Sequence, residues 1–385
     1  MFLNREEERM INGEYGEAVS EAMKIVVKVG EVLGADRLIP ITHAHASGIS
    51  YGTIGEPGLH WLKTLSARGA KVRVFSTINP IGMDIDDPNK IPVGIEFYKK
   101  QIEVLKALSS MGFNVTVTCT PYYIRTPSKK EHLAWGESSA VAYANSVLGA
   151  YTNREGGMLA IAAAITGRTY YAGLHLEENR ITTHRVKVTG ISDPAEWSAV
   201  GLEIGEIVGN GTPRYVNPPI SETSLKLLLA ASAASGSIAL SVIEGVTPRD
   251  TYREGTEEKI EVDEKSVTKY FGDVSDAELL FHGCPHVSVD ELKLLNDRIK
   301  GVRSGKEVWI AVSPHVYNIA SSMGLTKDIE RKGIKLVKGT CSVVTPIEKL
   351  GIRKVATTSA KTYFYLKRKG LDVWLVRVND IKGVL

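Results

Sequence analysis

Apolar and polar positions along this chain alternate between short β-rich runs and longer stretches with helical spacing. The helical patterns cover residues 5–34, 58–68, 93–111 and 140–151. Short apolar runs typical of strands lie at residues 38–41, 71–75, 113–119, 278–281, 308–312, 335–337, 354–357 and 374–378. Because strand, loop and helix follow one another repeatedly, the pattern predicts an α/β fold.

The 385 residues are enough for two or three domains. Residues 209–223 hold three prolines and two glycines and are the best candidate linker. We therefore expect an N-terminal α/β region over residues 1–215 and a C-terminal α/β region over residues 216–385. A further subdivision is possible near residues 247–265, which are polar and charged.

Composition limits the classes of partner and compartment. The net charge of +3 is small for this length, so nothing calls for nucleic acid or an acidic membrane surface. No charged segment followed by an apolar one opens the chain, and serines interrupt the apolar run Leu227–Ile243, which favours a buried helix over a membrane span. We expect a protein of the reducing cytoplasm.

The cysteines share one sequence context. Cys119, Cys284 and Cys341 each lie where a predicted strand runs out and turn-forming residues begin. Open α/β sheets bind ligands beyond the carboxyl ends of their strands, so three thiols at such an edge are able to hold an iron–sulfur cluster. Three ligands are one fewer than a four-iron cluster needs, which leaves one iron open. The alternative is that each cysteine is a small buried apolar residue.

Loops at other predicted strand ends have groups suited to anions. Gly48, Ile49 and Ser50 offer backbone N–H groups and a hydroxyl, and Asn79-Pro80 offers an amide in a fixed turn. Ser139 and Ala140 precede a predicted helix, and Lys361 adds a positive charge. Ordinary turn and capping chemistry explains the same residue types.

Three histidines are weaker candidates. His43 and His45 have the spacing to share one face of a strand, but no third ligand is evident, so we expect ordinary hydrogen-bonded histidines. His286, two residues after Cys284, is better placed to support a cluster than to bind it.

Seven segments resemble the aconitase X family, and together they run from about residue 42 to about residue 365. They are THAHASGISYGTIGEPG, FSTINPIGMD, TCTPYY, WGESSAVAYANSVLGAYTNREGG, FHGCPHVSVDEL, GTCSVVTPI and TTSAKTYFY. The resemblance implies an aconitase-like α/β fold of several domains, with cluster and substrate at the carboxyl ends of strands. The chain lacks the CxxC pair of ordinary aconitases.

The resemblance also implies site residues and partners. Cys119, Cys284 and Cys341 fall on the ligand positions of a 4Fe-4S cluster with one open iron. The implied substrate contacts are Gly48, Ile49, Ser50, Asn79, Pro80, Ser139, Ala140 and Lys361, with Lys361 also supporting catalysis. A small swivelling-domain subunit completes a heterodimer and supplies the general base, so this chain alone is expected to be inactive.

The implied activity is that of a hydro-lyase. An unfused chain of this kind is expected to dehydrate (R)-5-phosphomevalonate to trans-anhydromevalonate 5-phosphate in a modified mevalonate pathway of isoprenoid biosynthesis. A dehydratase of another small hydroxy acid, such as cis-3-hydroxy-L-proline, is the alternative. Alternatives of other classes are an RNA-binding regulator that senses its cluster, which the near-neutral charge supports poorly, and a cluster-free structural subunit.

Overall fold

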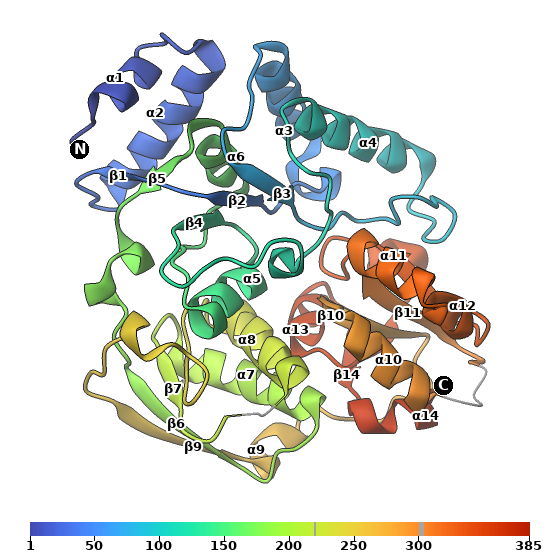
Figure 1. Cartoon of the computed structure of the whole chain (residues 1–385). Helices are drawn as coiled ribbons and strands as arrows, with labels where there is room; N and C mark the ends of the chain where they lie inside the picture. The colour runs from blue at the N-terminus through green and yellow to red at the C-terminus, as the bar shows by residue number, and fades with distance from the viewer. Residues whose placement is uncertain (219–220, 300–303) are drawn as a thin grey trace.

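The computed structural model describes residues 1–218, 221–299 and 304–385, in which the strands form four sheets. Figure 1 shows the N-terminal region at the top, the region around β6, β7 and β9 below it, and the C-terminal region at the right. Helices α5 and α13 lie near the middle, where the three regions approach one another.

In the N-terminal region, a parallel sheet has the order β3-β2-β4. Its strands are β2 (His43–Ala46), β3 (Phe75–Ile78) and β4 (Leu133–Trp135). A second pair, β1 (Leu38–Pro40) and β5 (Arg168–Tyr170), is antiparallel. The helices of this region are α1 (Arg5–Ile11), α2 (Glu17–Val32), α3 (Tyr51–Ala67), α4 (Ile95–Ser110), α5 (Ser138–Tyr143) and α6 (Gly157–Thr166).

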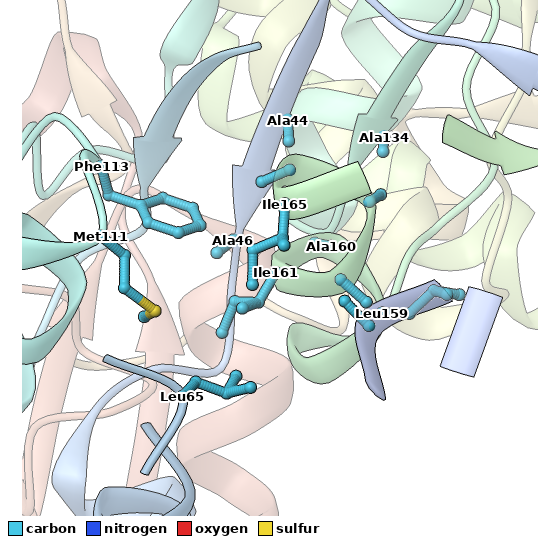
Figure 2. Close-up of a cluster of buried hydrophobic side chains, with 14 of the residues drawn as sticks. Ala44, Ala46, Leu65, Met111, Phe113, Ala134, Leu159, Ala160, Ile161 and Ile165 are labelled. Atoms are coloured by element: carbon cyan, nitrogen blue, oxygen red, sulfur yellow. The ribbon is translucent and has the colours of Figure 1, made fainter. Parts of the chain in front are cut away.

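The core of this region packs α6 against the central strand β2. Ala44 and Ala46 of β2 face Ile161 and Ile165 of α6, and all four side chains are buried (Figure 2). Small side chains on the strand let the larger residues of the helix approach closely, as close packing of an interior requires. The loops that follow the strands of this sheet therefore start from a closely packed core.

The middle region has a parallel sheet of order β8-β7-β6-β9 packed on two helices. The strands are β6 (His184–Thr189), β7 (Pro213–Tyr215), β8 (Val242–Ile243) and β9 (Glu258–Asp263). The helices are α7 (Pro194–Val208), α8 (Glu222–Ser235) and α9 (Glu264–Thr268). Gly205 lets α7 approach the end of α8, since a Cβ atom there would lie 2.8 Å from the backbone nitrogen of Gly236.

The C-terminal region is a doubly wound parallel sheet of order β12-β11-β10-β13-β14. Its strands are β10 (Leu279–Val287), β11 (Glu307–Val312), β12 (Lys335–Lys338), β13 (Lys354–Thr357) and β14 (Asp372–Leu375). Its helices are α10 (Val289–Arg298), α11 (Pro314–Ser322), α12 (Leu325–Glu330), α13 (Ala360–Arg368) and α14 (Ile381–Val384). The strand order reverses between β10 and β13, and such switch points bind ligands at their carboxyl ends.

The α/β prediction is confirmed, but several elements differ from the expected ones. Residues 5–34 form two helices, because Gly13 and Gly16 adopt positive φ angles between them. Residues 113–119 form only an isolated bridge at Asn114 where a strand was predicted, since the turn at Val117, with φ of 36°, interrupts pairing with β3. The strand predicted at residues 71–75 begins at Phe75.

Two further expectations concern the middle of the chain. Strand β7 lies within the candidate linker at residues 209–223, whose residues 219 and 220 fall outside the described residues. The division into two regions near residue 215 stays a prediction. The apolar run Leu227–Ile243 begins within the buried helix α8, and none of the described helices is long and apolar enough to cross a membrane.

Candidate active site

Three neighbouring parallel strands of the N-terminal sheet end at one place. Beyond β2 comes the loop of Gly48, Ile49 and Ser50; beyond β3 comes Asn79; and beyond β4 comes Glu137. Because β2 lies between β3 and β4, these loops must lie side by side at the carboxyl edge of the sheet. The substrate loops predicted from the sequence are therefore adjacent.

Lys361 reaches the same place from the C-terminal region. It lies in the first turn of α13, just beyond β13, and is only 5% exposed. Its ammonium forms an ion pair with the carboxylate of Glu137 and donates to Ser138 Oγ at 3.3 Å and Ser139 Oγ at 3.4 Å. The contact joins residues more than 220 positions apart in the sequence.

Glu137 collects several donors on one carboxylate. Asn79 Nδ2 donates to its Oε2 at 2.8 Å, and the Ser139 backbone N–H and hydroxyl donate to its Oε1 at 3.3 and 3.0 Å. Burial alone would raise the pKa of Glu137, but Lys361 and these hydrogen bonds outweigh it and hold the pKa well below its usual range. Burial likewise opposes the charge of Lys361, whereas Glu137 and the three nearby thiols raise its pKa. Both groups are therefore charged at neutral pH.

The loop after β2 presents a polar atom without an internal partner. Ser50 is 1% exposed and precedes α3, yet its hydroxyl does not cap that helix, and Ser50 Oγ is unpartnered among the described residues. Gly48 has a φ of 67°, which an L side chain rarely adopts, and is exposed, while Ile49 is buried. This buried hydroxyl has no partner in the described part of the chain, and its loop lies next to the loops of Asn79 and Glu137. Such a hydroxyl suits a bound polar group.

The remaining predicted substrate residues, Pro80 and Ala140, are buried beside Asn79 and Ser139. Helix α5 begins at Ser138, two residues earlier than the predicted helix, and the carboxylate of Glu137 caps it. The substrate-binding roles of these residues stay predictions.

The three cysteines gather from three segments of the chain. Cys119 Sγ accepts a hydrogen bond at 3.1 Å from the backbone N–H of His286, and His286 lies two residues after Cys284. His286 Nε2 contacts the carbonyl oxygen of Thr340 at 2.6 Å, directly before Cys341. The thiols of Cys284 and Cys341 are hydrogen-bonded to each other. One backbone segment around His286 thus ties all three cysteines together.

The sequence placed each cysteine at a strand end, and the structure refines this placement. Cys341 lies three residues beyond β12, as predicted, and Cys119 follows the interrupted segment beside β3. Cys284 instead lies inside β10, in a part where the register is broken between His282 and Val287. That break frees this part of the strand from regular pairing.

Electrostatics around the thiols favour a thiolate at Cys284. Its hydrogen bond with Cys341 lowers the pKa of Cys284 against the opposing effect of burial, and Lys361 lowers it further. The same hydrogen bond raises the pKa of Cys341, and burial raises the pKa of Cys119 to about 12. The positive charge of Lys361 therefore faces the place where negative charge on sulfur would gather.

The donor set fits an iron–sulfur cluster better than a single metal ion. Within residues 1–218, 221–299 and 304–385, no three His, Cys, Asp or Glu side chains form a group that could hold one ion. In a cluster each thiolate binds a different iron, so the thiols surround a shared space and need not converge on a point. Cys119 and Cys284 are buried and Cys341 is half-buried, and the three thiols with Lys361 nearby fit that requirement.

Glu137 is the main residue that the sequence analysis missed. It appears there only within the segment WGESSAVAY, with no role assigned to it. A buried carboxylate between a strand end and two serines is a recognisable signal, but its partner Lys361 is too distant in sequence to be inferred. His43 and His45 are hydrogen-bonded, as predicted, and the structure shows that both are buried.

Comparison with known proteins identifies the family. Models of the first, second and third domains of aconitase X match residues 1–178, 182–272 and 277–382. This chain belongs to the aconitase X family. Membership of that family suggests an iron–sulfur cluster, in agreement with the three thiols.

Several relatives have assigned activities. The phosphomevalonate dehydratase large subunit of Thermococcus kodakarensis is 42% identical to this chain, over 100% of this chain and 99% of that protein. The phosphomevalonate dehydratase large subunit of Methanocaldococcus jannaschii is also 42% identical, over 95% of each protein. The cis-3-hydroxy-L-proline dehydratase of Hypocrea jecorina is more distant, at 31% identity over 94% of this chain and 65% of that protein. All three relatives are named as dehydratases.

The fold is also found in a solved structure. A crystal structure of Thermococcus kodakaraensis aconitase X in its holo-form superimposes with a TM-score of 0.93 and 40% identity, covering 99% of both chains. The aconitase-like architecture expected from the sequence is therefore confirmed.

Proposed function

We propose that this aconitase X chain is the large subunit of a phosphomevalonate dehydratase, a hydro-lyase that acts on (R)-5-phosphomevalonate. The observation that carries the proposal is the buried Lys361–Glu137 pair beside three gathered thiols. This arrangement supplies a cation for an anionic substrate and ligands for a cluster in one place. The near-full-length similarity to phosphomevalonate dehydratase large subunits supports the choice of substrate over hydroxyproline.

The cofactor we propose is a 4Fe-4S cluster on Cys119, Cys284 and Cys341. When bound, such a cluster with one iron free of protein ligands supplies a Lewis acid for the departing hydroxyl group. The chain's own contribution is to bury Cys119 and Cys284 and to place Lys361 beside the thiols. Because the site needs free thiols, we place the protein in the reducing cytoplasm.

Lys361 has donors to give to the substrate. Its bonds to Ser138 Oγ and Ser139 Oγ are long, at 3.3 and 3.4 Å. A carboxylate or phosphate oxygen is a stronger acceptor than a neutral hydroxyl, so a substrate anion would replace these contacts while Glu137 keeps its own. The unpartnered Ser50 Oγ and the exposed backbone at Gly48 add donors for the substrate.

Glu137 is poorly suited to remove a proton. Its pKa is held well below the usual range, and an effective general base has a pKa near the working pH. Glu137 therefore holds Lys361 in place, and the base has to come from elsewhere. We propose that it comes from a small partner subunit, which the name of the relatives also implies.

The test is reconstitution with a defined substrate pair. The chain is loaded with iron and sulfide without oxygen and mixed with its small subunit. (R)-5-phosphomevalonate and cis-3-hydroxy-L-proline are then supplied separately. We expect loss of water from phosphomevalonate only, and no turnover by either subunit alone. Turnover of hydroxyproline only, or turnover by this chain alone, would contradict the proposal.

A further inference from the structure

A buried line of hydrogen bonds extends from Glu137 back into the N-terminal sheet. Asn79 Nδ2 donates to Glu137, and Asn79 Oδ1 lies 3.2 Å from His45 Nε2. His45 Nδ1 lies 2.8 Å from Thr77 Oγ1, which also lies 2.8 Å from His43 Nε2. His43, His45 and Thr77 are all completely buried.

The direction of every bond in this line follows from the charge at its end. Ionised Glu137 only accepts, so the amide nitrogen of Asn79 must face it and the amide oxygen must face His45. His45 then carries its proton on Nε2 and accepts at Nδ1. The Thr77 hydroxyl has to donate to that nitrogen and accept from His43 Nε2.

The far end of the line agrees with this assignment. His43 Nδ1 would carry no proton, and it is the one ring nitrogen of the two histidines that has no partner among the described residues. Burial lowers the pKa of both rings, that of His45 to about 4, so both are neutral near pH 7. Neutral rings keep one donor and one acceptor each, which preserves the sequence of donors.

We propose that His45 is a positioning residue for the dehydration: it fixes the amide of Asn79, which in turn fixes Glu137 and the ammonium of Lys361 against the substrate. The proposal rests on the proposed function for its substrate. Without the His45 donor, the Asn79 amide is free to turn its oxygen toward Glu137 and repel it. Lys361 would then lose its fixed direction while the thiols remain as they are.

Packing in the core alone does not explain why position 45 is a histidine. His43 and His45 occupy the central strand β2, where buried parallel strands usually carry Val, Ile or Leu. An aliphatic side chain would fill the space without the cost of burying polar atoms. Both histidines lie in T-shaped arrangements with Trp135, so they also serve packing, but packing needs no donor at Nε2.

The kinetic test compares two substitutions in the reconstituted two-subunit enzyme. In His45→Gln, the side-chain amide offers a donor and an acceptor in place of the ring nitrogens, whereas His45→Leu offers neither. We expect His45→Leu to lower kcat/KM for phosphomevalonate about 10-fold or more, chiefly through KM, with its iron content unchanged. We expect His45→Gln to recover most of that loss.

His175→Leu is the matched control. His175 is also a buried histidine with a lowered pKa, bonded to His132 at 3.0 Å and not to this line. Its KM should equal that of the unmodified enzyme. Equal KM values for His45→Leu and His45→Gln would show that His45 only fills space and would overturn the proposal.

A second measurement needs no substrate and remains valid if phosphomevalonate is the wrong one. Nitrogen-15 NMR of the full chain with labelled histidine reports which ring nitrogen carries the proton. We expect the Nε2–H form for both His43 and His45 near pH 7, assigned with His43→Gln and His45→Gln. In Thr77→Val, which keeps the volume of the side chain, the Nδ1 signal of His45 should shift because its donor is lost. An Nδ1–H form of His45 would overturn the proposal whatever the enzyme's substrate is.

Discussion

At the scale of single residues, the site depends on buried charges that have to neutralise one another. A buried ion loses hydration that only a close partner can replace, so each member of the Lys361–Glu137 pair requires the other. The pair also separates two tasks: Glu137 stays ionised and holds Lys361, and Lys361 keeps donors for a substrate anion. Glu155 is also a buried carboxylate, but no cation among the described residues offsets its burial, and its pKa is raised instead of lowered.

Replacing the lysine should separate binding from folding. In Lys361→Met, we expect kcat/KM for phosphomevalonate to fall about 100-fold or more, because the substrate loses its cation. The variant should also be less stable by about 3 kcal/mol, since Glu137 stays buried without a partner. Arg168→Met is the control, because Arg168 on β5 is ion-paired with the buried carboxylate of Glu7. It should show a similar loss in urea unfolding while KM stays unchanged; an equal rise of KM in both variants would contradict the role of Lys361.

Glu155 should make the chain less stable as pH rises. Burial raises the pKa of Glu155 to about 7 from 4.5, so the folded state binds more protons than the unfolded state between these values. Its contribution is fully present below about pH 4.5 and falls by roughly 3 kcal/mol as pH rises through 7. Urea unfolding at a series of pH values should show this fall for the unmodified chain and not for Glu155→Gln.

Because the base is assigned to the small subunit, Glu155→Gln should also keep its turnover in the reconstituted enzyme. A loss of turnover of about 1,000-fold would identify Glu155 as the base instead.

At the scale of elements, the site exists because loops from separate sheets are fixed against one another. Asp84, which is completely buried, follows β3 and accepts the backbone N–H of Lys338 at the end of β12 at 2.8 Å. It also accepts the backbone N–H groups of Asp86 and Asp87 at 3.0 and 3.1 Å. This carboxylate therefore joins the carboxyl end of β3 to the strand that leads to Cys341.

Removing that carboxylate should loosen the cysteine segment. In Asp84→Ala three backbone donors lose their acceptor, and we expect a loss of about 3 kcal/mol in urea unfolding and a lower iron content after reconstitution. Asp86→Ala is the control, because Asp86 is 61% exposed and its ion pair with Lys338 is worth at most about 1 kcal/mol. Full iron content in Asp84→Ala would show that the cysteine segment keeps its position without this contact.

Local pattern predicted most of the elements that surround this site. The strands at residues 308–312, 335–337 and 354–357 lie almost where periodicity put them, since buried parallel strands are uninterrupted apolar runs. The strand predicted at residues 113–119 was wrong, because an alternating pattern cannot reveal the positive φ of Val117. The sequence also gave no reason to pair Glu137 with Lys361, because the pairing depends on how the two sheets meet.

At the scale of the whole molecule, three regions contribute to one centre. The N-terminal sheet supplies Asn79, Glu137 and the loop at Ser50. The C-terminal sheet supplies Cys284 and Lys361 at its switch point and Cys341 beyond the edge strand β12. The middle region supports α13, since Ser198 Oγ of α7 accepts the backbone N–H of Ala360 at 2.8 Å. We propose that this centre holds one cluster shared by all three cysteines.

The most direct test is the iron and acid-labile sulfide content of the chain after anaerobic reconstitution, with its electron paramagnetic resonance spectrum. Cys119→Ser, Cys284→Ser and Cys341→Ser are measured beside the unmodified chain. Lys361→Met serves as a control that changes the same site without removing a thiol. We predict a near-stoichiometric cluster in the unmodified chain and in Lys361→Met, and its loss in each cysteine variant. A cluster that survives any one of the three serine substitutions, or no cluster in the unmodified chain, would contradict the shared site and the dehydration mechanism built on it.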